Sequence, residues 1–310
     1  MHITNKAVAA GVLAAGLLLT TGAFAQQAFD LTPAQADRPH TTKSDAAVAL
    51  ISPDFKFANP GKLTVAITLG SPPIGTYATD SATPVGGDPD IAALLAEKFG
   101  LELNLVPVAW PDWPLGVISG KYDAVISNVT VTEERKEKLD FSTYRKDVLG
   151  FYVKSDSAIT SIKEPKDVAG LKLITGSGTN QEKILLEWDK ENQAAGLKPV
   201  EFQYYDDSAA AQLAIDSGRA DGEFDPNSSL AYFAATDGKT KLVGTVSGGW
   251  PLTAEIAVTT RKGAGLADAF TAAINEIIAD GTYGAALKRW SLDAEAVDKS
   301  ATNPPGLPKS

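Results

Sequence analysis

The sequence predicts an α/β fold made of two lobes, each built on a mostly parallel sheet flanked by helices. Two stretches, residues 61–126 and 170–225, alternate strand patterns with helix patterns. Such alternation is typical of parallel strands joined by crossover helices. The stretches also share a short echo, LGVISGKYDAVIS against QLAIDSGRADGEFD, in which a helix ends at Ser-Gly and a base, an aspartate and a strand follow. The length is near the upper end for one domain, so two similar lobes account better for the pattern.

Residues 1–25 are predicted to be a cleavable signal peptide. Lys6 precedes an uncharged run at residues 7–20, and the triplet AFA before Gln26 fits a cleavage site between small residues. The apolar run is too short to span a membrane. Residues 26–60 are polar, contain prolines and show no sustained period, so we expect an extended arm in which SDAAVALIS could form a short helix.

Strand and helix patterns then follow one another in the first lobe. LTVAITL predicts a strand, and DIAALLAEKFG predicts a helix that starts at Asp90 and is capped by Gly100. LELNLVPV predicts a second strand, the stretch around PLGVISG predicts a helix, and DAVIS predicts a third strand.

The second lobe repeats this order. GLKLITGSGTNQEKILLEW reads as strand, glycine turn and helix, VEFQYY as a strand, SAAAQLAIDSG as a helix and RADGEFD as a strand. The chain closes with a strand at AEIAVTTRKG and helices at LADAFTAAINEIIADG and GTYGAALKRW. A proline-rich tail follows at residues 293–310.

The composition excludes several kinds of chemistry. There is no cysteine, and of the two histidines His2 falls in the signal peptide and His40 in the arm, so Ser-His-Asp, Cys-His and histidine-rich zinc sites are ruled out. The formal net charge of −10 argues against binding to nucleic acid or anionic membranes. An enzyme that uses carboxylates alone remains open, but the inventory favours a binding protein.

The stretch SNVTVTEERKEKLDFS, residues 127–142, places hydrogen-bonding side chains directly after the buried strand DAVIS. Asn128 and Thr130 would lie at the carboxyl edge of the sheet, where α/β proteins bind ligands, and Arg135 would reach the same crevice. A guanidinium pairs with a carboxylate through two parallel hydrogen bonds, so the pattern favours a site for a carboxylate. The alternatives are a surface arginine paired with a neighbouring glutamate, and threonines that only cap a helix.

Several motifs run in a fixed order along residues 61–292: VAITLGSPPIG, GGDPDIAALLAEKFG, ISGKYDAVISNVTVTEERKEKLDFS, GLKLITGSGT, SGRAD and GTYGAALKRW. In this order they resemble the bacterial extracellular solute-binding proteins of family 3, the periplasmic receptors of polar amino-acid ABC importers. The resemblance implies a type II periplasmic-binding-protein clamshell, in which two lobes joined by two hinge strands hold a ligand between them. The first lobe would then comprise residues 61–148 and 251–292, and the second lobe residues 149–250. It also implies a periplasmic monomer that works with an ABC permease of the inner membrane, without cofactor or metal.

The resemblance implies roles for individual residues as well. Arg135 would bind the α-carboxylate of the ligand, Thr130 and Asn128 its carboxylate and α-ammonium, and Trp110 would stack on it. Backbone N–H groups of the second lobe would come from Ser177, Gly178, Thr179 and Asn180, at a helix start that favours anions.

The sequence departs from the family pattern at the pocket. Ile74 stands where the family usually has phenylalanine, which removes one aromatic wall. Asp225 would hold the α-ammonium, although it lies one position early, and Glu223 flanks it across Phe224. The two acids would suit the cationic side chain of arginine, lysine or histidine. A small polar or acidic amino acid is the competing choice.

The leading functional hypothesis is a receptor that captures an amino acid between its lobes and delivers it to an ABC permease. The rival hypothesis is an enzyme on the same scaffold, because periplasmic cyclohexadienyl or arogenate dehydratases resemble this family and keep the carboxylate-binding arginine. Glu223 would then be the candidate acid. A ligand-presenting adaptor for a sensor is a third reading that uses the same binding chemistry.

Overall fold

The computed structural model describes residues 29–205 and 207–309. The predicted signal peptide, residues 1–25, lies outside the described residues. No helix in the described ranges combines the length and the apolar character that crossing a membrane requires.

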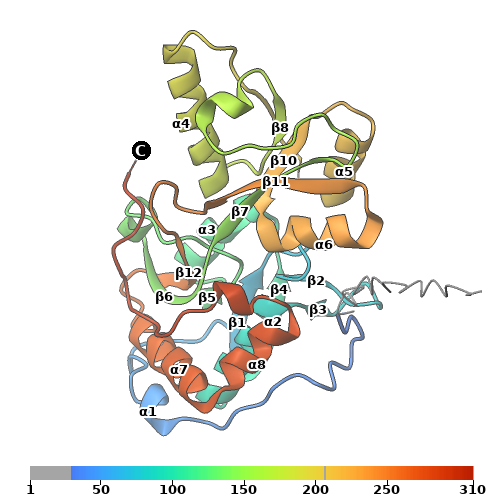
Figure 1. Cartoon of the computed structure of the whole chain (residues 1–310). Helices are drawn as coiled ribbons and strands as arrows, with labels where there is room; N and C mark the ends of the chain where they lie inside the picture. The colour runs from blue at the N-terminus through green and yellow to red at the C-terminus, as the bar shows by residue number, and fades with distance from the viewer. Residues whose placement is uncertain (1–28, 206, 310) are drawn as a thin grey trace, which may run out of the picture.

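Two five-stranded sheets form the two halves of this structure (Figure 1). The first sheet has the strand order β4-β1-β5-β12-β6. Its strands are β1 (Lys62–Ile67), β4 (Glu102–Pro107), β5 (Ala124–Val125), β6 (Leu139–Lys146) and β12 (Glu255–Arg261). Because β12 is antiparallel to both of its neighbours, the other four strands run in one direction.

The second sheet is built in the same way, with the order β11-β7-β10-β8-β9. Its strands are β7 (Val148–Lys154), β8 (Lys172–Ile174), β9 (Glu201–Gln203), β10 (Gly222–Pro226) and β11 (Thr240–Ser247). Here β7 is the one strand that is antiparallel to both of its neighbours. The predicted fold class, α/β with two mostly parallel sheets, is therefore confirmed.

Helices cover both faces of the sheets. Those of the first lobe are α1 (Asp45–Val48), α2 (Gly87–Phe99), α3 (Trp113–Ile118), α7 (Ala267–Asp280) and α8 (Thr282–Arg289), and those of the second are α4 (Asn180–Ala194), α5 (Ser208–Asp216) and α6 (Asn227–Asp237). Leu63 and Val65 of β1 join the core formed with α2, α7 and α8, whereas Ala66 joins the core under α3. Burial on both faces explains why β1 is almost wholly apolar.

The short elements are the hairpin strands β2 (Thr76–Tyr77) and β3 (Pro84–Val85) and four 3₁₀ turns, η1 (Trp110–Asp112), η2 (Arg135–Glu137), η3 (Pro165–Val168) and η4 (Asp293–Glu295). The sequence did not predict the hairpin, β6, β7, α6 or β11. It also placed the start of α2 at Asp90, which is wrong by one turn. The helix begins at Gly87, because Gly86 enters it at φ 140°, and Pro89 is tolerated in the first turn, where no N–H partner is needed.

The sequence echo between the lobes corresponds to a shared structure. Asp123, just before β5, accepts the N–H of Thr64 on β1 with its carboxylate at 2.7 Å and donates its own N–H to the Thr64 carbonyl at 2.9 Å. Asp221, just before β10, does the same with Lys172 of β8, at 2.8 Å for both bonds. The aspartate of each echo thus ties the strand that follows it to a neighbouring strand of its own sheet, β5 to β1 in the first lobe and β10 to β8 in the second.

The chain crosses between the sheets twice, from β6 to β7 at Asp147 and from β11 to β12 at residues 248–254. The two crossings lie side by side. The backbone carbonyl of Asp147 accepts the N–H of Gly248 at 3.0 Å, and the N–H of Asp147 donates to the carbonyl of Ala254 at 3.2 Å. These are the two connecting strands that the fold class requires.

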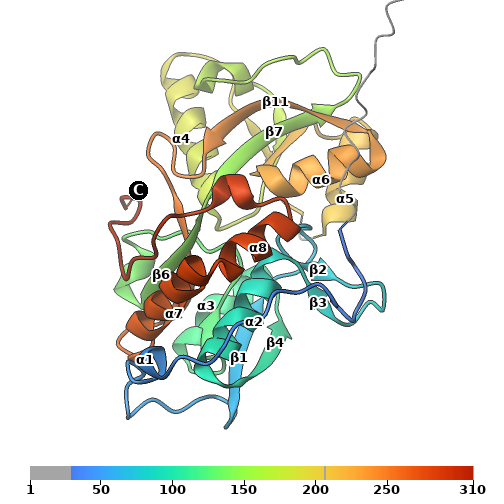
Figure 2. The ribbon, with the colours of Figure 1, turned by 60° about the horizontal axis from the view of Figure 1, so that its bottom comes forward.

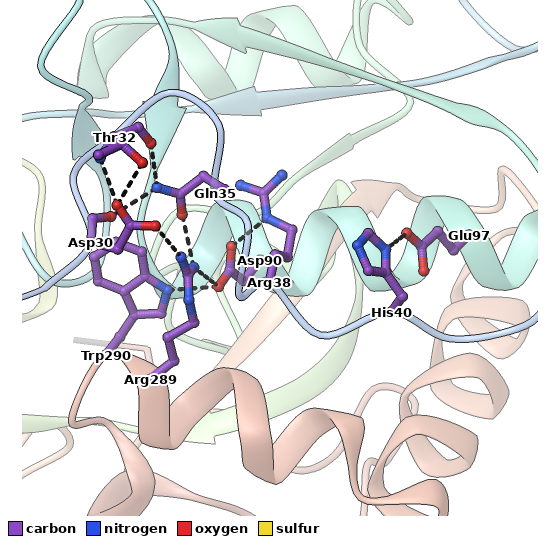
Figure 3. A network of polar contacts seen from close by, with 9 residues as sticks. All are labelled: Asp30, Thr32, Gln35, Arg38, His40, Asp90, Glu97, Arg289 and Trp290. Atoms are coloured by element: carbon purple, nitrogen blue, oxygen red, sulfur yellow. Dashed lines mark hydrogen bonds and ion pairs between the residues drawn. The ribbon is translucent and has the colours of Figure 1, made fainter.

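The N-terminal arm lies on the first lobe, where Figure 2 shows it crossing α2. Asp90, fully buried on α2, accepts hydrogen bonds from Arg38 of the arm and from Arg289 and Trp290 at the end of α8, each at 2.7 Å. Farther along the arm His40 contacts Glu97 of α2 at 2.6 Å (Figure 3). The arm is thus tied to the first lobe through its helices.

The C-terminal tail also lies on the first lobe. It runs beside β6, where Thr143 donates its N–H to Ala301 at 3.1 Å and Asn303 donates its own to Phe141 at 2.9 Å. Farther on, Leu307 donates to the carbonyl of Val131 and accepts from the N–H of Glu133. The tail therefore adds backbone pairing to the loop that joins β5 to β6.

Candidate functional site

A cavity of about 380 Å³ lies between the two lobes. Its walls come from segments that follow β1, β4 and β5 in the first lobe and β8 in the second, and from β10 itself. These segments place the cavity at carboxyl ends of strands, which is where open α/β sheets bind ligands.

Most of the predicted site residues line this cavity. They are Ile74, Trp110, Asn128, Thr130 and Arg135 from the first lobe and Ser177, Thr179, Asn180, Glu223 and Asp225 from the second. Gly178 is outside the lining, but its carbonyl oxygen lies 3.4 Å from Nη2 of Arg135. Sequence reasoning missed further lining residues, among them Thr68, Ser127, Gln181 and Tyr205. Their position at strand and helix ends is the signal that could have found them.

Arg135 begins the turn η2 and is held by two contacts within its own loop. Its N–H donates to Thr132 Oγ1 at 3.0 Å, and its Nη1 donates to the carbonyl of Thr130 at 2.9 Å. The guanidinium carbon lies 5.8 Å from the ring centre of Trp110 and 5.7 Å from that of Trp113. The Thr132 hydroxyl thus holds the backbone at the start of the turn, and the guanidinium lines the cavity.

Within residues 29–205 and 207–309, no carboxylate lies at ion-pair distance from Arg135. The neighbouring glutamates pair elsewhere, Glu134 with Lys183 of α4 and Glu137 with Lys309 of the tail. Burial lowers the pKa of Arg135 to about 10, so the group keeps its charge at neutral pH while being partly desolvated. A half-buried cation of this kind is stabilised by any anion that enters the cavity.

Asn128 has a constrained position at the end of β5. Its φ of 51° lies in the left-handed region, which asparagine tolerates better than most residues, and its N–H donates to Asp88 Oδ2 at 2.9 Å. Its amide oxygen accepts a hydrogen bond from Arg145. One end of the Asn128 amide is thus engaged inside the first lobe rather than with the cavity.

Arg145 is a buried arginine that sequence reasoning missed. Only 1% of its side chain is exposed. It pairs with Glu295 of η4, and Asp88 of α2 lies 3.9 Å away. Asp88 also accepts the hydroxyl of Tyr144 at 2.8 Å. The only signal in the sequence is a charged residue within the otherwise buried strand β6, and nothing there reveals its partner 150 residues later.

The acids of the second lobe form a pair. Glu223 and Asp225 alternate with Phe224 on β10 and share one face of the strand, while Phe224 packs in the core. Their carboxyl groups are close enough for the charge of Asp225 to raise the pKa of Glu223. Gln181 donates to Asp225 at 2.6 Å and Gln212 to Glu223 at 3.2 Å.

Burial controls the ionisation of this pair. It raises the pKa of Asp225 to about 6, and together with the charge of Asp225 it raises the pKa of Glu223 well above its usual range. Two buried carboxylates side by side also repel each other, which favours a proton on one of them. The pair therefore forms an acidic wall that is not fully ionised.

The glycine turn before α4 is first of all a helix cap. Thr179 Oγ1 accepts the N–H of Glu182 at 3.2 Å, and the N–H of Gly178 donates to Glu182 Oε2 at 2.6 Å. Gly178 has a φ of 70°, which favours glycine. Its N–H is thus already used within the second lobe, while Ser177, Thr179 and Asn180 face the cavity.

The two lobes touch at the mouth of the cavity. Ser208 of α5 donates to the carbonyl of Gly70 at 2.8 Å, and Ser229 of α6 donates to that of Ser71 at 3.2 Å. Lys183 reaches Glu134 from the opposite lobe. The cavity is therefore bounded by direct contacts between the lobes.

A polar cavity between two α/β lobes, with a cation on one wall and acids on the other, defines the class of proteins that bind small charged solutes. The bacterial extracellular solute-binding proteins, family 3, match residues 63–293, and the chain belongs to this family.

Individual relatives agree with that assignment. The L-cystine-binding protein TcyJ of Escherichia coli is 32% identical over 74% of this chain and 82% of its own. A solved structure of an ancestral arginine-binding protein bound to arginine superposes with a TM-score of 0.65 at 28% identity, covering 74% of this chain and 98% of that one. The cyclohexadienyl dehydratase of Pseudomonas aeruginosa is 28% identical over 52% of this chain and 58% of its own length. The dehydratase is thus a more distant relative.

Proposed function

We propose that the protein is a periplasmic receptor that captures an amino acid between its two lobes and delivers it to an ABC permease of the inner membrane. The observation that carries this proposal is the charge arrangement of the cavity, with Arg135 on one wall and Glu223 and Asp225 on the other. An amino acid is a zwitterion and needs both. Two of the relatives named above are an L-cystine-binding and an arginine-binding protein, which supports the same ligand class.

Each wall would bind one end of the ligand. Arg135 would pair with the α-carboxylate through charge-assisted hydrogen bonds, with the hydroxyl of Thr130 and the helix start at Ser177–Asn180 adding donors. Asp225 would accept the α-ammonium. Trp110 would stack on the ligand and Ile74 would supply an apolar wall, while Asn128 would act mainly through its contact with Arg145.

Ligand capture would work by closure of the lobes. We infer that residues 61–148 with 251–292 move as one unit against residues 149–250, and that the crossings near Asp147 and Gly248 act as hinges. A ligand that touches both walls favours the closed form because it gains contacts only there. The signal peptide would be removed on export, and the receptor would work as a monomer without a cofactor.

We propose binding rather than catalysis, although the acid pair of the second lobe is also what a proton-transfer enzyme would need. Incubation of the protein with prephenate or arogenate is therefore a necessary control. The proposal expects no aromatic product.

The test is a thermal-shift panel of the twenty amino acids with amines and opines as further ligands. At least one amino acid should raise the melting temperature, and the rise should grow with ligand concentration because the ligand binds only the folded state. Arg135→Ala should abolish the shift. Arg219→Ala, which removes an exposed arginine of the second lobe, should keep it. A normal shift in the Arg135 variant would mean that the site is assigned wrongly.

A further inference from the structure

The pocket holds one more acid than an ordinary zwitterion needs. Among the described residues that line the cavity, the charged ones are Arg135, Glu223 and Asp225. This lining contains no lysine. The α-carboxylate of an amino acid would neutralise Arg135, and its α-ammonium would neutralise Asp225. Glu223 would then remain as a carboxyl group that is 7% exposed.

The surroundings of Glu223 offer it no cation. In the described ranges neither Glu223 nor Asp225 is within ion-pair distance of a lysine, arginine or histidine. The groups that face the pair are the amides of Gln181 and Gln212, the N–H of Gly176, and Tyr152, which lies opposite Glu223 on β7. Burial raises the pKa of Tyr152 to about 12, so the phenol stays neutral, and the nearby Asp147 adds only further negative charge.

A buried carboxylate without a partner is strongly destabilising, so the pair must gain a positive charge when the cavity is closed. A proton can supply it, and the burial that raises the pKa of both carboxyl groups favours this solution in the free protein. A second cationic group of the ligand can supply it as well. A glutamine at position 223 would fill the same space without the free-energy cost of burying a charge. A carboxyl group at this position is therefore favourable only if it binds such a cation.

We propose that the ligand is an amino acid with a second positively charged nitrogen besides its α-ammonium, and that Glu223 binds this nitrogen. The proposal rests on the amino-acid receptor function above. On binding, the O–H bond of the shared proton breaks, the proton passes to the solvent buffer, and the ligand nitrogen takes its place between the two carboxylates. The second nitrogen can belong to a basic side chain, as in L-arginine, or to a second α-ammonium, as in L-cystine.

The experiment is calorimetric titration of the mature protein near neutral pH in buffers of different ionisation enthalpy, which reports the number of protons released. L-arginine and L-cystine are the two probes, and L-glutamine is the neutral comparison. We expect the tighter of the two probes to release about one proton, whereas L-glutamine releases none and binds at least about tenfold more weakly. Which probe releases the proton identifies the source of the second nitrogen.

Glu223→Gln is the decisive variant. It should lose the proton release and bind the preferred probe at least about tenfold more weakly, while its affinity for L-glutamine is kept. Glu201→Gln, which changes an exposed acid on strand β9 of the same sheet, is the matched control and should behave as the wild type. Tighter binding of L-glutamine than of either probe, or unchanged probe binding by Glu223→Gln, would overturn the inference and leave the receptor function standing. If no amino acid bound at all, the proposed function itself would fall.

Discussion

At the scale of single residues, two arginines ten positions apart have opposite roles. Arg145 points into the first lobe, where Glu295, Asp88 and Asn128 surround it. Arg135 lies on a loop at the cavity, and its hydrogen bonds go to the carbonyls of Thr130 and Gly178. The first arginine is neutralised within the fold, whereas the second is still able to bind an external anion.

The acid pair makes a prediction about the stability of the ligand-free protein. The pKa of Glu223 is raised in the folded state, so its stabilising contribution is complete below the unfolded pKa and is lost as the pH rises toward the folded pKa. Glu223→Gln removes this titration. Its melting temperature should exceed that of the wild type at about pH 8, and the difference should shrink toward about pH 4, where an unfolded glutamate also holds its proton.

The measurement is a series of melting curves of both proteins across this pH range without ligand. Glu201→Gln should show no such pH-dependent gain, because its carboxyl group is exposed. Parallel curves for the wild type and Glu223→Gln would contradict the claim that Glu223 is buried with a raised pKa.

At the scale of elements, the C-terminal tail supports the loop that carries the candidate anion site. Leu307 pairs with Val131 and Glu133 through backbone hydrogen bonds of 3.0 and 2.9 Å. On the opposite side, the same loop pairs with β12, since Val131 donates to Glu255 at 2.9 Å. A β-carbon placed on Gly249 would lie 2.6 Å from Leu307 Cδ2, so Leu307 also packs closely against one of the crossings between lobes.

Removal of residues 304–310 should therefore weaken the site without unfolding the protein. The loop would have to be ordered by the ligand itself, and at roughly 0.5–1.5 kcal/mol for each immobilised side chain we expect about a tenfold loss of affinity. Calorimetry measures the affinity, and hydrogen exchange at residues 130–135 should become faster. Lys309→Ala, which removes only the surface pair with Glu137, is the control. Unchanged affinity and exchange in the truncated protein would show that the tail gives the loop no support.

Periodicity explains which elements were predictable. The strands β1, β4 and β8 and the helices α2, α4 and α7 were foreseen because their residues alternate or recur within one segment. The arm and the tail have no period, since they pack through single contacts such as Arg38 with Asp90 and Leu307 with Val131. Such partners lie far apart in the sequence, and only the folded chain brings them together.

The candidate site was predictable for a related reason. Arg135 follows β5 and Asp225 lies near the end of β10, so strand order alone places each at the carboxyl edge of its own sheet. The inward contact of Asn128 was not predictable, because it depends on Arg145, whose position inside the lobe is set by the register of β6 with β12.

At the scale of the whole molecule, the N-terminal arm contacts both lobes. Phe29 of the arm lies 5.5 Å from the ring of Trp290 in the first lobe and stacks at 5.6 Å on Tyr232 of α6 in the second. Together with the contacts of Ser208 and Ser229 at the cavity mouth, this aromatic contact favours the present arrangement of the lobes. A ligand that spans the cavity would favour it further.

The most direct measurement of the central claim compares the preferred amino acid with its α-carboxamide, which lacks the carboxylate charge, by calorimetry on the wild type and on Arg135→Ala. A hydrogen bond to a charged group contributes about 1.5–3 kcal/mol, so the wild type should bind the acid roughly 10- to 100-fold more tightly than the amide. Arg135→Ala should bind both weakly and without preference. Equal binding of acid and amide by the wild type, or a preference that survives the loss of Arg135, would contradict the account.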